Sequence, residues 1–154
     1  MRDVAAAPTL RPATVADLAV IASLDAASSP DPFGLSHLDR YCTGTAGCAA
    51  LLAIRESEPL AFALYSLVLD EGSIDNIAVL PQLRGRGFGG YLLDAVLQAM
   101  RERGAQRCVL DVRASNTAAR ALYASRGFGE DGLRRGYYTR DGSSEDAVLM
   151  SRRL

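Results

Sequence analysis

The chain has 154 residues, of which 49% are hydrophobic and 23% are charged. This usage is ordinary for a globular protein and excludes disordered, collagen-like and coiled-coil classes. The length predicts a single domain over residues 1–154. The 17 basic and 18 acidic residues leave a formal net charge of −1, so no overall field attracts nucleic acid or an anionic membrane. We therefore expect neither a nucleic-acid nor a membrane partner.

The cysteine and histidine content excludes two kinds of site. The three cysteines cannot pair completely as disulfides, and with His37 as the one histidine they cannot complete a tetrahedral zinc set. We expect no metal and interpret the cysteines as small core residues in a reducing cytosol. Residues 1–7 lack the apolar core of a signal peptide, and the longest apolar run, 48–54, is far short of the ~20 residues of a membrane helix. A cytoplasmic location is the expectation.

Apolar runs and turn residues predict the first half of the chain. Residues 9–12 suit an edge strand, because their proline cannot donate to an inner ladder. A helix is expected to begin after Thr14, with Asp17 as its capping partner, and a short second helix is expected over 36–42. Three short apolar runs then predict an antiparallel meander: 49–54, 60–69 and 73–79.

The second half changes to a strand–helix–strand pattern. Apolar residues recur at helical spacing over 88–100, and Gly104 marks the end of this helix. A strand over 108–112 and a shorter helix over 116–125 follow, and the tail predicts a hairpin around a polar turn at 141–144. The prediction is an α/β (α+β) fold with one mixed sheet of about seven strands and with about four helices.

The most informative segment, residues 79–90, joins the last meander strand to the long helix. Four of its last six residues are glycines, which let backbone N–H groups approach an anion at a helix N-terminus. Arg84 and Arg86 add guanidinium groups that suit phosphate oxygens. The segment favours a diphosphate ligand; the alternative is a glycine-rich surface turn with two solvated arginines.

A dinucleotide is one diphosphate that these residues suggest. Gly85, Gly87 and Gly90 satisfy the G-x-G-x-x-G pattern, with Asp111 in the place of the ribose-binding acid. Against this, residues 81–84 separate the glycines from the strand end, and arginines crowd the turn. Too little chain follows Asp111 to complete a doubly wound sheet. The dinucleotide interpretation is therefore the weaker one.

The pattern Arg84-x-x-Gly87-x-Gly89 resembles the pyrophosphate-binding motif of the GNAT family, the GCN5-related N-acetyltransferases, whose loop holds the diphosphate of acetyl-CoA. The expected order of elements is similar to that family over essentially the entire chain and implies the GNAT acyl-CoA N-acyltransferase fold. Further blocks look like the RimI type, the ribosomal-protein alanine N-acetyltransferases of bacteria. These blocks are 77–79, 86–89, 111–116, 121–123, 127–128 and 134–138.

The resemblance implies a contact surface for acetyl-CoA, with no metal. The N–H of Val79 is the implied donor to the thioester oxygen. The residues implied to bind acetyl-CoA are Ile77, Ala78, Val79, Arg84, Gly85, Arg86, Gly87, Phe88, Gly89, Gly90, Asn116 and Tyr123. By themselves, residues 77–79 would be interpreted as plain core and Asn116 as a helix N-cap.

Two residues are implied to move protons. Asp111 falls at the general-base position, where the family usually has glutamate, and Tyr123 falls at the general-acid position. Aspartate is shorter by about 1.5 Å of reach, so a water is expected to bridge it to the amine. The alternatives are that Asp111 caps a strand end or pairs with Arg113, and that Tyr123 is an ordinary core tyrosine. His37 lies outside every matching motif and is expected to be a surface or hinge residue.

A third set is expected to bind the acceptor. Tyr138, or less favourably Tyr137, lies in the predicted loop before the last strand and resembles a tyrosine that closes over a peptide N-terminus. Cross-strand packing is the alternative. Asp75, together with Asp70 and Glu71, is expected to line a groove for a basic acceptor.

The resemblance implies an acetyl-CoA-dependent N-acetyltransferase that acts on a peptide or protein N-terminus by direct attack in a ternary complex. The implied acceptor is the N-terminal alanine of a small-subunit ribosomal protein. An α-amine, with a pKa of about 7.7–8.0, is partly neutral near pH 7, whereas a lysine at about 10.4 is almost fully charged. The base therefore has less to do for an N-terminus. A lysine or small-molecule amine as acceptor, and a CoA-binding module without catalysis, are the alternatives.

Overall fold

The structure, a computed structural model, describes residues 7–140, with the side chain of Arg140 left aside, and residues 142–154. Most of the N-terminal stretch considered for a signal peptide, and Asp141 of the expected polar turn, lie outside the described residues. In the described part, seven strands form one sheet in the order β1-β2-β3-β4-β5-β7-β6. The strands are β1 (Thr9–Pro12), β2 (Cys48–Arg55), β3 (Glu58–Val68), β4 (Glu71–Val79), β5 (Arg107–Arg113), β6 (Gly129–Arg140) and β7 (Ser143–Arg153).

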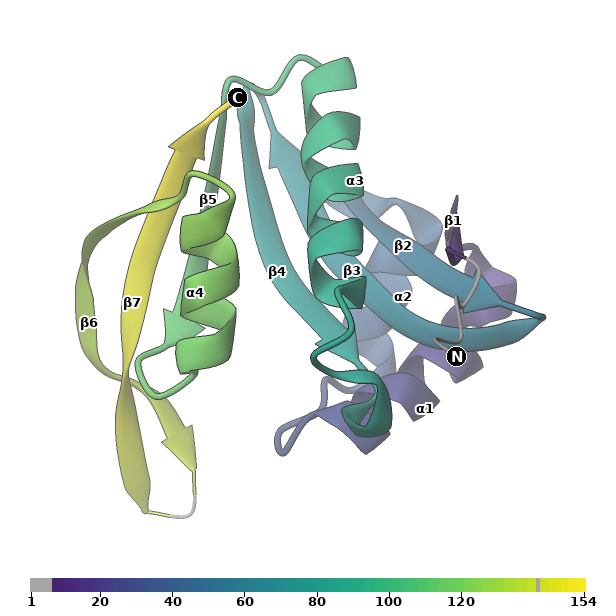
Figure 1. Cartoon of the computed structure of the whole chain (residues 1–154), viewed down its shortest axis with the longest axis horizontal. Helices are drawn as coiled ribbons and strands as arrows, with labels where there is room; N and C mark the ends of the chain where they lie inside the picture. Colours follow the sequence, from purple (N-terminus) through teal and green to yellow (C-terminus); the bar gives the residue numbers. More distant parts are fainter. Residues whose placement is uncertain (1–6, 141) are drawn as a thin grey trace, which may run out of the picture.

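Helices cover both faces of this sheet (Figure 1). The longer ones are α1 (Leu18–Ser28), α2 (Leu35–Thr43), α3 (Phe88–Glu102) and α4 (Thr117–Ser125). Helices α3 and α4 lie on one face, and α1 and α2 lie on the other. The expected mixed α/β sheet with seven strands and four helices is confirmed.

Two hydrophobic cores result, one under each helix layer. Along β3, Ala63 and Tyr65 pack into the α3/α4 core, whereas Phe62 and Leu64 pack into the α1/α2 core. Successive side chains of a strand point to opposite faces, so a strand covered on both faces must be apolar at every position. This is why β2 and β3 appear in the sequence as unbroken apolar runs.

The centre of the sheet is formed by β4 and β5, which pair over only part of their length. Strands β4 and β5 form the one parallel pair among the described strands, and α3 makes the crossover between them. Their pairing ends at Ile74 and Leu110, although β4 continues to Val79 and β5 to Arg113. Beyond this point the two strands separate (Figure 1), and the sheet opens between their carboxyl ends.

The C-terminal hairpin differs from its prediction. Tyr138 was expected in a loop, but β6 extends to Arg140 and Tyr138 pairs with Glu145 of β7. The register shifts between Arg134 and Tyr138, where Gly136 has a φ of +63° and donates its N–H to the Asp146 carboxylate. A bulge therefore replaces the predicted loop and lets an aromatic pair continue the strand.

The corner before α1 is fixed by a charged network. Asp17 accepts two hydrogen bonds from Arg11 at 2.8 Å each and one from the N–H of Thr14 at 2.8 Å. The capping partnership expected for Thr14 and Asp17 is confirmed. The Arg11 guanidinium is the main cause that holds the pKa of Asp17 well below its usual range.

Replacing Asp17 by Asn is expected to lower the free energy of unfolding at pH 7 by about 1–2 kcal/mol, because Arg11 and Thr14 lose a charged acceptor. The pKa of Asp17 is lower in the folded chain than in the unfolded one. Its contribution is therefore complete above the unfolded value of 3.8 and is lost as the pH falls from there through the folded pKa. Urea unfolding should show that the variant and the parent differ less in their free energy of unfolding at pH 3 than at pH 7. An equal difference at both pH values would contradict the ion pair as its origin.

Candidate active site

The opening between β4 and β5 coincides with a bulge in β4. Tyr65 of β3 pairs with Ile74 and Leu64 pairs with Asn76, so Asp75 has no partner on β3. Bulges bend a strand and redirect a side chain, and they are frequent beside active sites. The bulge therefore turns β4 away from β5 and places Asp75 at the point of separation.

The backbone of β4 turns hydrogen-bonding groups toward this opening. Leu80 donates its N–H to the carbonyl oxygen of Leu60 on β3 at 3.2 Å. Because successive N–H groups along a strand point to opposite sides, the N–H of Val79 points away from β3, toward β5. The Val79 N–H thus has the direction that its expected role requires.

The loop after β4 presents a row of free donors. Within the described residues, the N–H groups of residues 85–90 donate to no acceptor, and the first N–H after them, that of Tyr91, bonds Gly87 at 3.0 Å. Gly85 and Gly87 have φ values of +78° and +88°, and a Cβ at either would meet nothing within 4 Å. Glycine is needed here for the backbone conformation and leaves open space in front of the donors. The start of α3 is thus suited to an anion.

The two arginines of the loop have different surroundings. The Arg84 guanidinium donates to the carbonyl oxygen of Ser28, at the end of α1, at 2.7 Å and to that of Val79 at 3.3 Å. Arg86 is exposed and has no partner among the described residues. Arg84 therefore ties the loop to α1, and Arg86 is the arginine left for an anion.

Gly89 and Gly90 have a packing role that the sequence interpretation missed. A Cβ at Gly90 would lie 2.4 Å from the Arg126 guanidinium, and one at Gly89 would lie 3.3 Å from Leu122. Arg126 crosses from the end of α4 to an ion pair with Asp94 of α3 at 3.1 Å. These glycines thus let α4 approach α3 closely. The Phe88 side chain is buried in the α3/α4 core, so only its backbone faces the loop.

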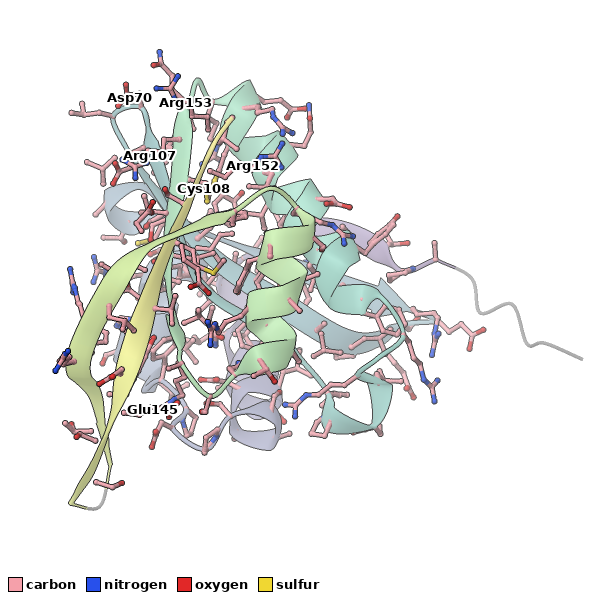
Figure 2. The ribbon with its side chains drawn as sticks, turned by 60° about the vertical axis from the view of Figure 1, so that its left-hand side comes forward. Asp70, Arg107, Cys108, Glu145, Arg152 and Arg153 are labelled. Carbon is pink, nitrogen blue, oxygen red and sulfur yellow. The ribbon has the colours of Figure 1, made fainter. Side chains whose placement is uncertain are left out.

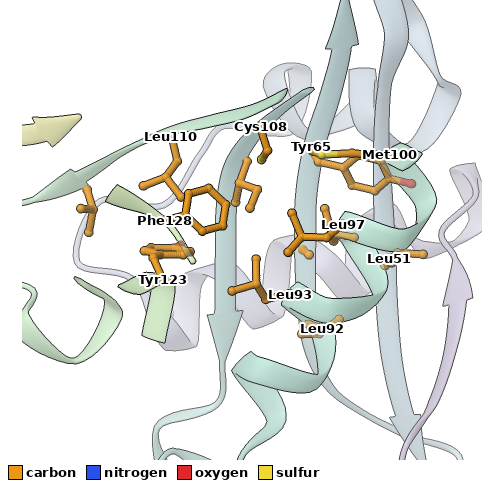
Figure 3. Packing of buried hydrophobic residues seen from close by; sticks show 14 of the residues in the cluster. Leu51, Tyr65, Leu92, Leu93, Leu97, Met100, Cys108, Leu110, Tyr123 and Phe128 are labelled. Atoms are coloured by element: carbon orange, nitrogen blue, oxygen red, sulfur yellow. The ribbon is translucent and has the colours of Figure 1, made fainter. Parts of the chain in front are cut away.

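Tyr123 approaches the opening from the α3/α4 face. Its ring is buried in that core and lies edge-on to Phe128, with centroids 5.7 Å apart (Figure 3). Burial raises the pKa of Tyr123 above its ordinary value, so the phenol keeps its proton. No described residue bonds its hydroxyl, which is not among the fully buried unsatisfied groups. Asn116 lies exposed at the start of α4 and caps this helix by accepting the N–H of Ala119 at 3.2 Å.

Asp111 approaches the opening from the other face. It follows Leu110, the last residue of β5 that pairs with β4, and its side chain is exposed. Within the described residues, the side chain of Asp111 makes no hydrogen bond or ion pair. The pairing with Arg113 that the sequence left open is therefore not found. Asp111 and Tyr123 do not share one face; they flank the opening.

Arg113 instead joins three segments on the Asp111 face. Its guanidinium contacts Asp31, in the loop between α1 and α2, at 2.9 Å and Glu145 at 3.4 Å. It also lies 4.3 Å from the ring centroid of Tyr138. Burial is the main cause that raises the pKa of Tyr138, and the nearby Asp111 carboxylate adds to it. Tyr137 is exposed and lies edge-on to Tyr138, with centroids 5.1 Å apart.

A hollow of about 800 Å³ lies beside this arginine. Its walls are the loop after α1, the end of β5 and the β6–β7 hairpin. The residues that line it are Pro30, Asp31, Arg113, Ala114, Ser115, Tyr138, Ser143, Ser144, Glu145 and Asp146. The hollow is open, most of the residues that line it are polar, and it reaches β5 at Arg113, two residues after Asp111.

Asp75 is held by groups that the sequence analysis did not identify. Tyr41 of α2 donates its hydroxyl to one carboxylate oxygen of Asp75 at 2.7 Å, and Ser73 donates to the other at 2.8 Å. His37 lies on α2 between Phe33 and Tyr41, with ring centroids 4.5 and 5.7 Å away, and its side chain stays partly exposed at the surface. The signal for Tyr41 was only its helical spacing from Leu38, which marks a core face.

Asp70 and Glu71 lie elsewhere. Glu71 is the first residue of β4 and pairs with Arg107, and Asp70 lies in the turn just before it, at the end of the strand away from the opening. Figure 2 shows Asp70 close to Arg107 and Arg153 and far from Glu145. The expectation that Asp70 and Glu71 line the acceptor groove with Asp75 is therefore wrong, because they lie at the start of β4, in its paired part, whereas Asp75 follows the last pair with β5.

Other classes of site have no support in the described residues. Among residues 7–140 and 142–154, no three histidine, cysteine or carboxylate side chains group as metal ligands. The cysteines are buried as expected, and burial raises the pKa of the Cys108 thiol to about 12. In the same residues, no helix is both long and apolar enough to cross a membrane.

Comparison with known proteins assigns the class. The profile of the acetyltransferase (GNAT) family matches residues 18–128, a segment that includes the glycine loop, Asp111 and Tyr123. The chain belongs to this family. A solved Arabidopsis thaliana NAA60 in complex with acetyl-CoA has the same fold, with a TM-score of 0.87 and 18% identity over 96% of this chain and 98% of that one.

More similar relatives share a narrower description. The crystal structure of the ribosomal-protein-S18-alanine N-acetyltransferase from Escherichia coli aligns with a TM-score of 0.88 and 32% identity, over 95% of this chain and 93% of that one. The [ribosomal protein bS18]-alanine N-acetyltransferase of Salmonella typhimurium is 46% identical over 91 residues, which are 59% of this chain and 62% of the relative. The chain thus spans about three fifths of the length of the curated relative that it matches.

Proposed function

We propose that residues 1–154 form one N-acetyltransferase domain that transfers the acetyl group of acetyl-CoA to the N-terminal amine of a protein. The observation that carries this proposal is the opening between β4 and β5, which has Asp111 on one face and Tyr123 on the other. The free N–H groups of residues 85–90 lie at one end of it. This arrangement separates the entry of an amine from the departure of a thiolate.

The transfer requires three groups of this chain. Asp111 accepts the proton of the amine, directly or through a water, as the nitrogen attacks the thioester carbon. The N–H of Val79 donates to the carbonyl oxygen, where negative charge develops. Tyr123 then gives its proton to the sulfur as the carbon–sulfur bond breaks, and it recovers a proton from solvent. No acyl-enzyme is needed, because the amine and the thioester meet in the same opening.

The acceptor that we propose is the N-terminal alanine of a small-subunit ribosomal protein, in the cytoplasm. Relatives with 46% and 32% identity are named as alanine N-acetyltransferases of ribosomal protein S18, which supports this acceptor. The hollow beside Tyr138 supports a chain as acceptor rather than a small amine, since about 800 Å³ exceeds what a single amine fills. Its lining has three carboxylates, Asp31, Glu145 and Asp146, against the one arginine that pairs with the first two, and this acidic excess suits a basic protein.

The proposal is tested by mass spectrometry on two basic peptides incubated with acetyl-CoA. One has a free N-terminal alanine and no lysine; the other is blocked at its N-terminus and carries one lysine. The chain itself contains no lysine, so it cannot accept acetyl groups on side-chain ammonium groups and obscure the result. We expect acetylation of the first peptide alone. Acetylation of the second alone would show that the acceptor is a lysine side chain. Binding of acetyl-CoA without any product would indicate a non-catalytic CoA-binding module.

Replacing Arg86 by Ala is expected to weaken acetyl-CoA binding about fivefold to tenfold at low salt, because one charge-assisted contact to phosphate is lost. Calorimetric titration at two salt concentrations measures the effect, which should shrink at high salt. Arg101→Ala is the matched control, since Arg101 is exposed near the other end of α3. Equal affinities for the two variants would contradict a phosphate contact by Arg86.

A further inference from the structure

We propose that Asp75 binds the charged amine of the acceptor, beside Asp111, and that Tyr41 and Ser73 are the residues that position it. This inference rests on the proposed function, because it concerns the same opening in the sheet. It adds a binding residue from β4 to a site whose base comes from β5. No bond is made or broken at Asp75.

The strand register brings the two carboxylates together. Ile74 and Leu110 are the last residues that pair between β4 and β5, and Asp75 and Asp111 are the next residue on each strand. The two strands are about 4.8 Å apart at their last pair, so Asp75 and Asp111 stand side by side where the opening begins. We expect one ammonium group to reach both carboxylates from between the strands.

The two carboxylates also share a face. Ser73 pairs with Val109, so these two residues point to the same side of the sheet. Asp111 follows Val109 by two residues and therefore points to that side as well. The Ser73 hydroxyl reaches Asp75 at 2.8 Å, which places the Asp75 carboxylate on the same side. This is the face toward α2, from which Tyr41 donates to Asp75.

The Asp75 carboxylate is held in place but can accept further hydrogen bonds. Each of its oxygens accepts one hydrogen bond, from Tyr41 or from Ser73, and a carboxylate oxygen has a second lone pair. Burial and the bond to Asp75 raise the pKa of Tyr41 above its ordinary value, so this phenol remains a donor. The carboxylate is half-buried and keeps acceptor capacity on the side of the opening.

The two negative charges favour binding of a cation between Asp75 and Asp111. Within the described residues, neither Asp75 nor Asp111 forms an ion pair with an arginine. Like charges on neighbouring strands repel, and partial burial of one increases the cost. Arg113, two residues beyond Asp111, is engaged by Asp31 and Glu145 instead. An ammonium group is a small cation with three donors and matches this site.

The test compares two peptides that differ only in the charge. One is a basic hexapeptide that begins with alanine; the other carries a propanoyl group in place of that alanine and has no α-amine. Both are titrated calorimetrically into the chain saturated with CoA. Asp75→Asn keeps the shape and one acceptor oxygen, and its amide nitrogen can donate to the second hydroxyl, which then accepts instead of donating. Asp70→Asn, just before the start of β4, is the matched control.

We expect Asp75→Asn to weaken binding of the amine peptide about tenfold, the loss of one charged hydrogen bond, and to leave the propanoyl peptide unchanged. Tyr41→Phe should weaken the amine peptide by about twofold to threefold, and Asp70→Asn should affect neither. Equal loss for both peptides would overturn the proposal, because a wall of the groove would give that result. No loss for either would overturn it as well.

The same titrations separate this inference from the proposed function. A parent chain that prefers the amine peptide but forms no acetylated product would refute the transferase and leave Asp75 as an ammonium-binding residue. A parent chain that acetylates the amine peptide, with Asp75→Asn binding both peptides as the parent does, would refute only the role of Asp75.

Discussion

Replacing Asp111 by Asn is expected to lower kcat for an N-terminal alanine peptide by about 10²-fold at pH 7, near the lower end of what a general base contributes. The lower end applies because an α-amine with a pKa of about 7.7–8.0 is already partly neutral at this pH. The deficit should shrink as the pH rises above 8, where the amine loses its proton to solvent. Steady-state kinetics from pH 6.5 to 9 measure both the loss of kcat and its dependence on pH.

Two further variants make the Asp111 result decisive. The Asp111 side chain makes no hydrogen bond or ion pair in the described residues that its replacement would break, so the fold should be unaffected. Asp111→Glu should retain activity, because the longer side chain still carries a base toward the amine. Asp70→Asn should match the parent. An Asp111→Asn variant with the kcat of the parent at pH 6.5 would remove Asp111 from the reaction.

Replacing Phe62 by Ala is expected to lower the free energy of unfolding by about 3–5 kcal/mol, the usual cost when a buried phenylalanine leaves a cavity. Phe62 is 0% exposed in the centre of β3 and packs under α1 and α2. A loss of this size is a large part of the about 5–15 kcal/mol by which domains are stable. Urea unfolding at pH 7 measures it.

The matched control for Phe62 is on the same strand. Val68 is 65% exposed at the end of β3, so Val68→Ala should change the free energy of unfolding by no more than about 0.5 kcal/mol. A Phe62→Ala variant that loses less than about 1 kcal/mol would contradict the tight packing of the α1/α2 core.

The sequence was sufficient for the elements and for their order. The unbroken apolar runs of β2 and β3, the helical spacing over α3 and the glycines after α3 and α4 depend on neighbours in sequence, and each was predicted within a few residues. The hairpin was predicted less well. A bulge at Gly136 keeps Tyr138 in β6, and the signal for a bulge, a glycine within a strand, is also the signal for a loop.

The site was predictable in part, since its motifs are local and its contacts are not. The glycine loop is one continuous segment, so the sequence alone predicts that a helix begins there and that its backbone N–H groups are free to donate. That Arg84 bonds Ser28 of α1 and that Gly90 makes room for Arg126 depends on residues distant in sequence. The same is true of Tyr41 and Asp75, which are 34 positions apart. Asp70 and Glu71 were misplaced because charge alone does not tell which end of a strand faces a site.

The most direct test of the account is the crystal structure of the chain with CoA joined through an acetyl linker to the N-terminus of an alanine peptide. We expect the diphosphate at the N–H groups of residues 85–90, the linker between β4 and β5, and the peptide in the hollow beside Tyr138. The nitrogen should lie on the Asp111 face and the sulfur toward Tyr123. A conjugate bound outside the opening, or one with nitrogen and sulfur on the same face, would contradict the account.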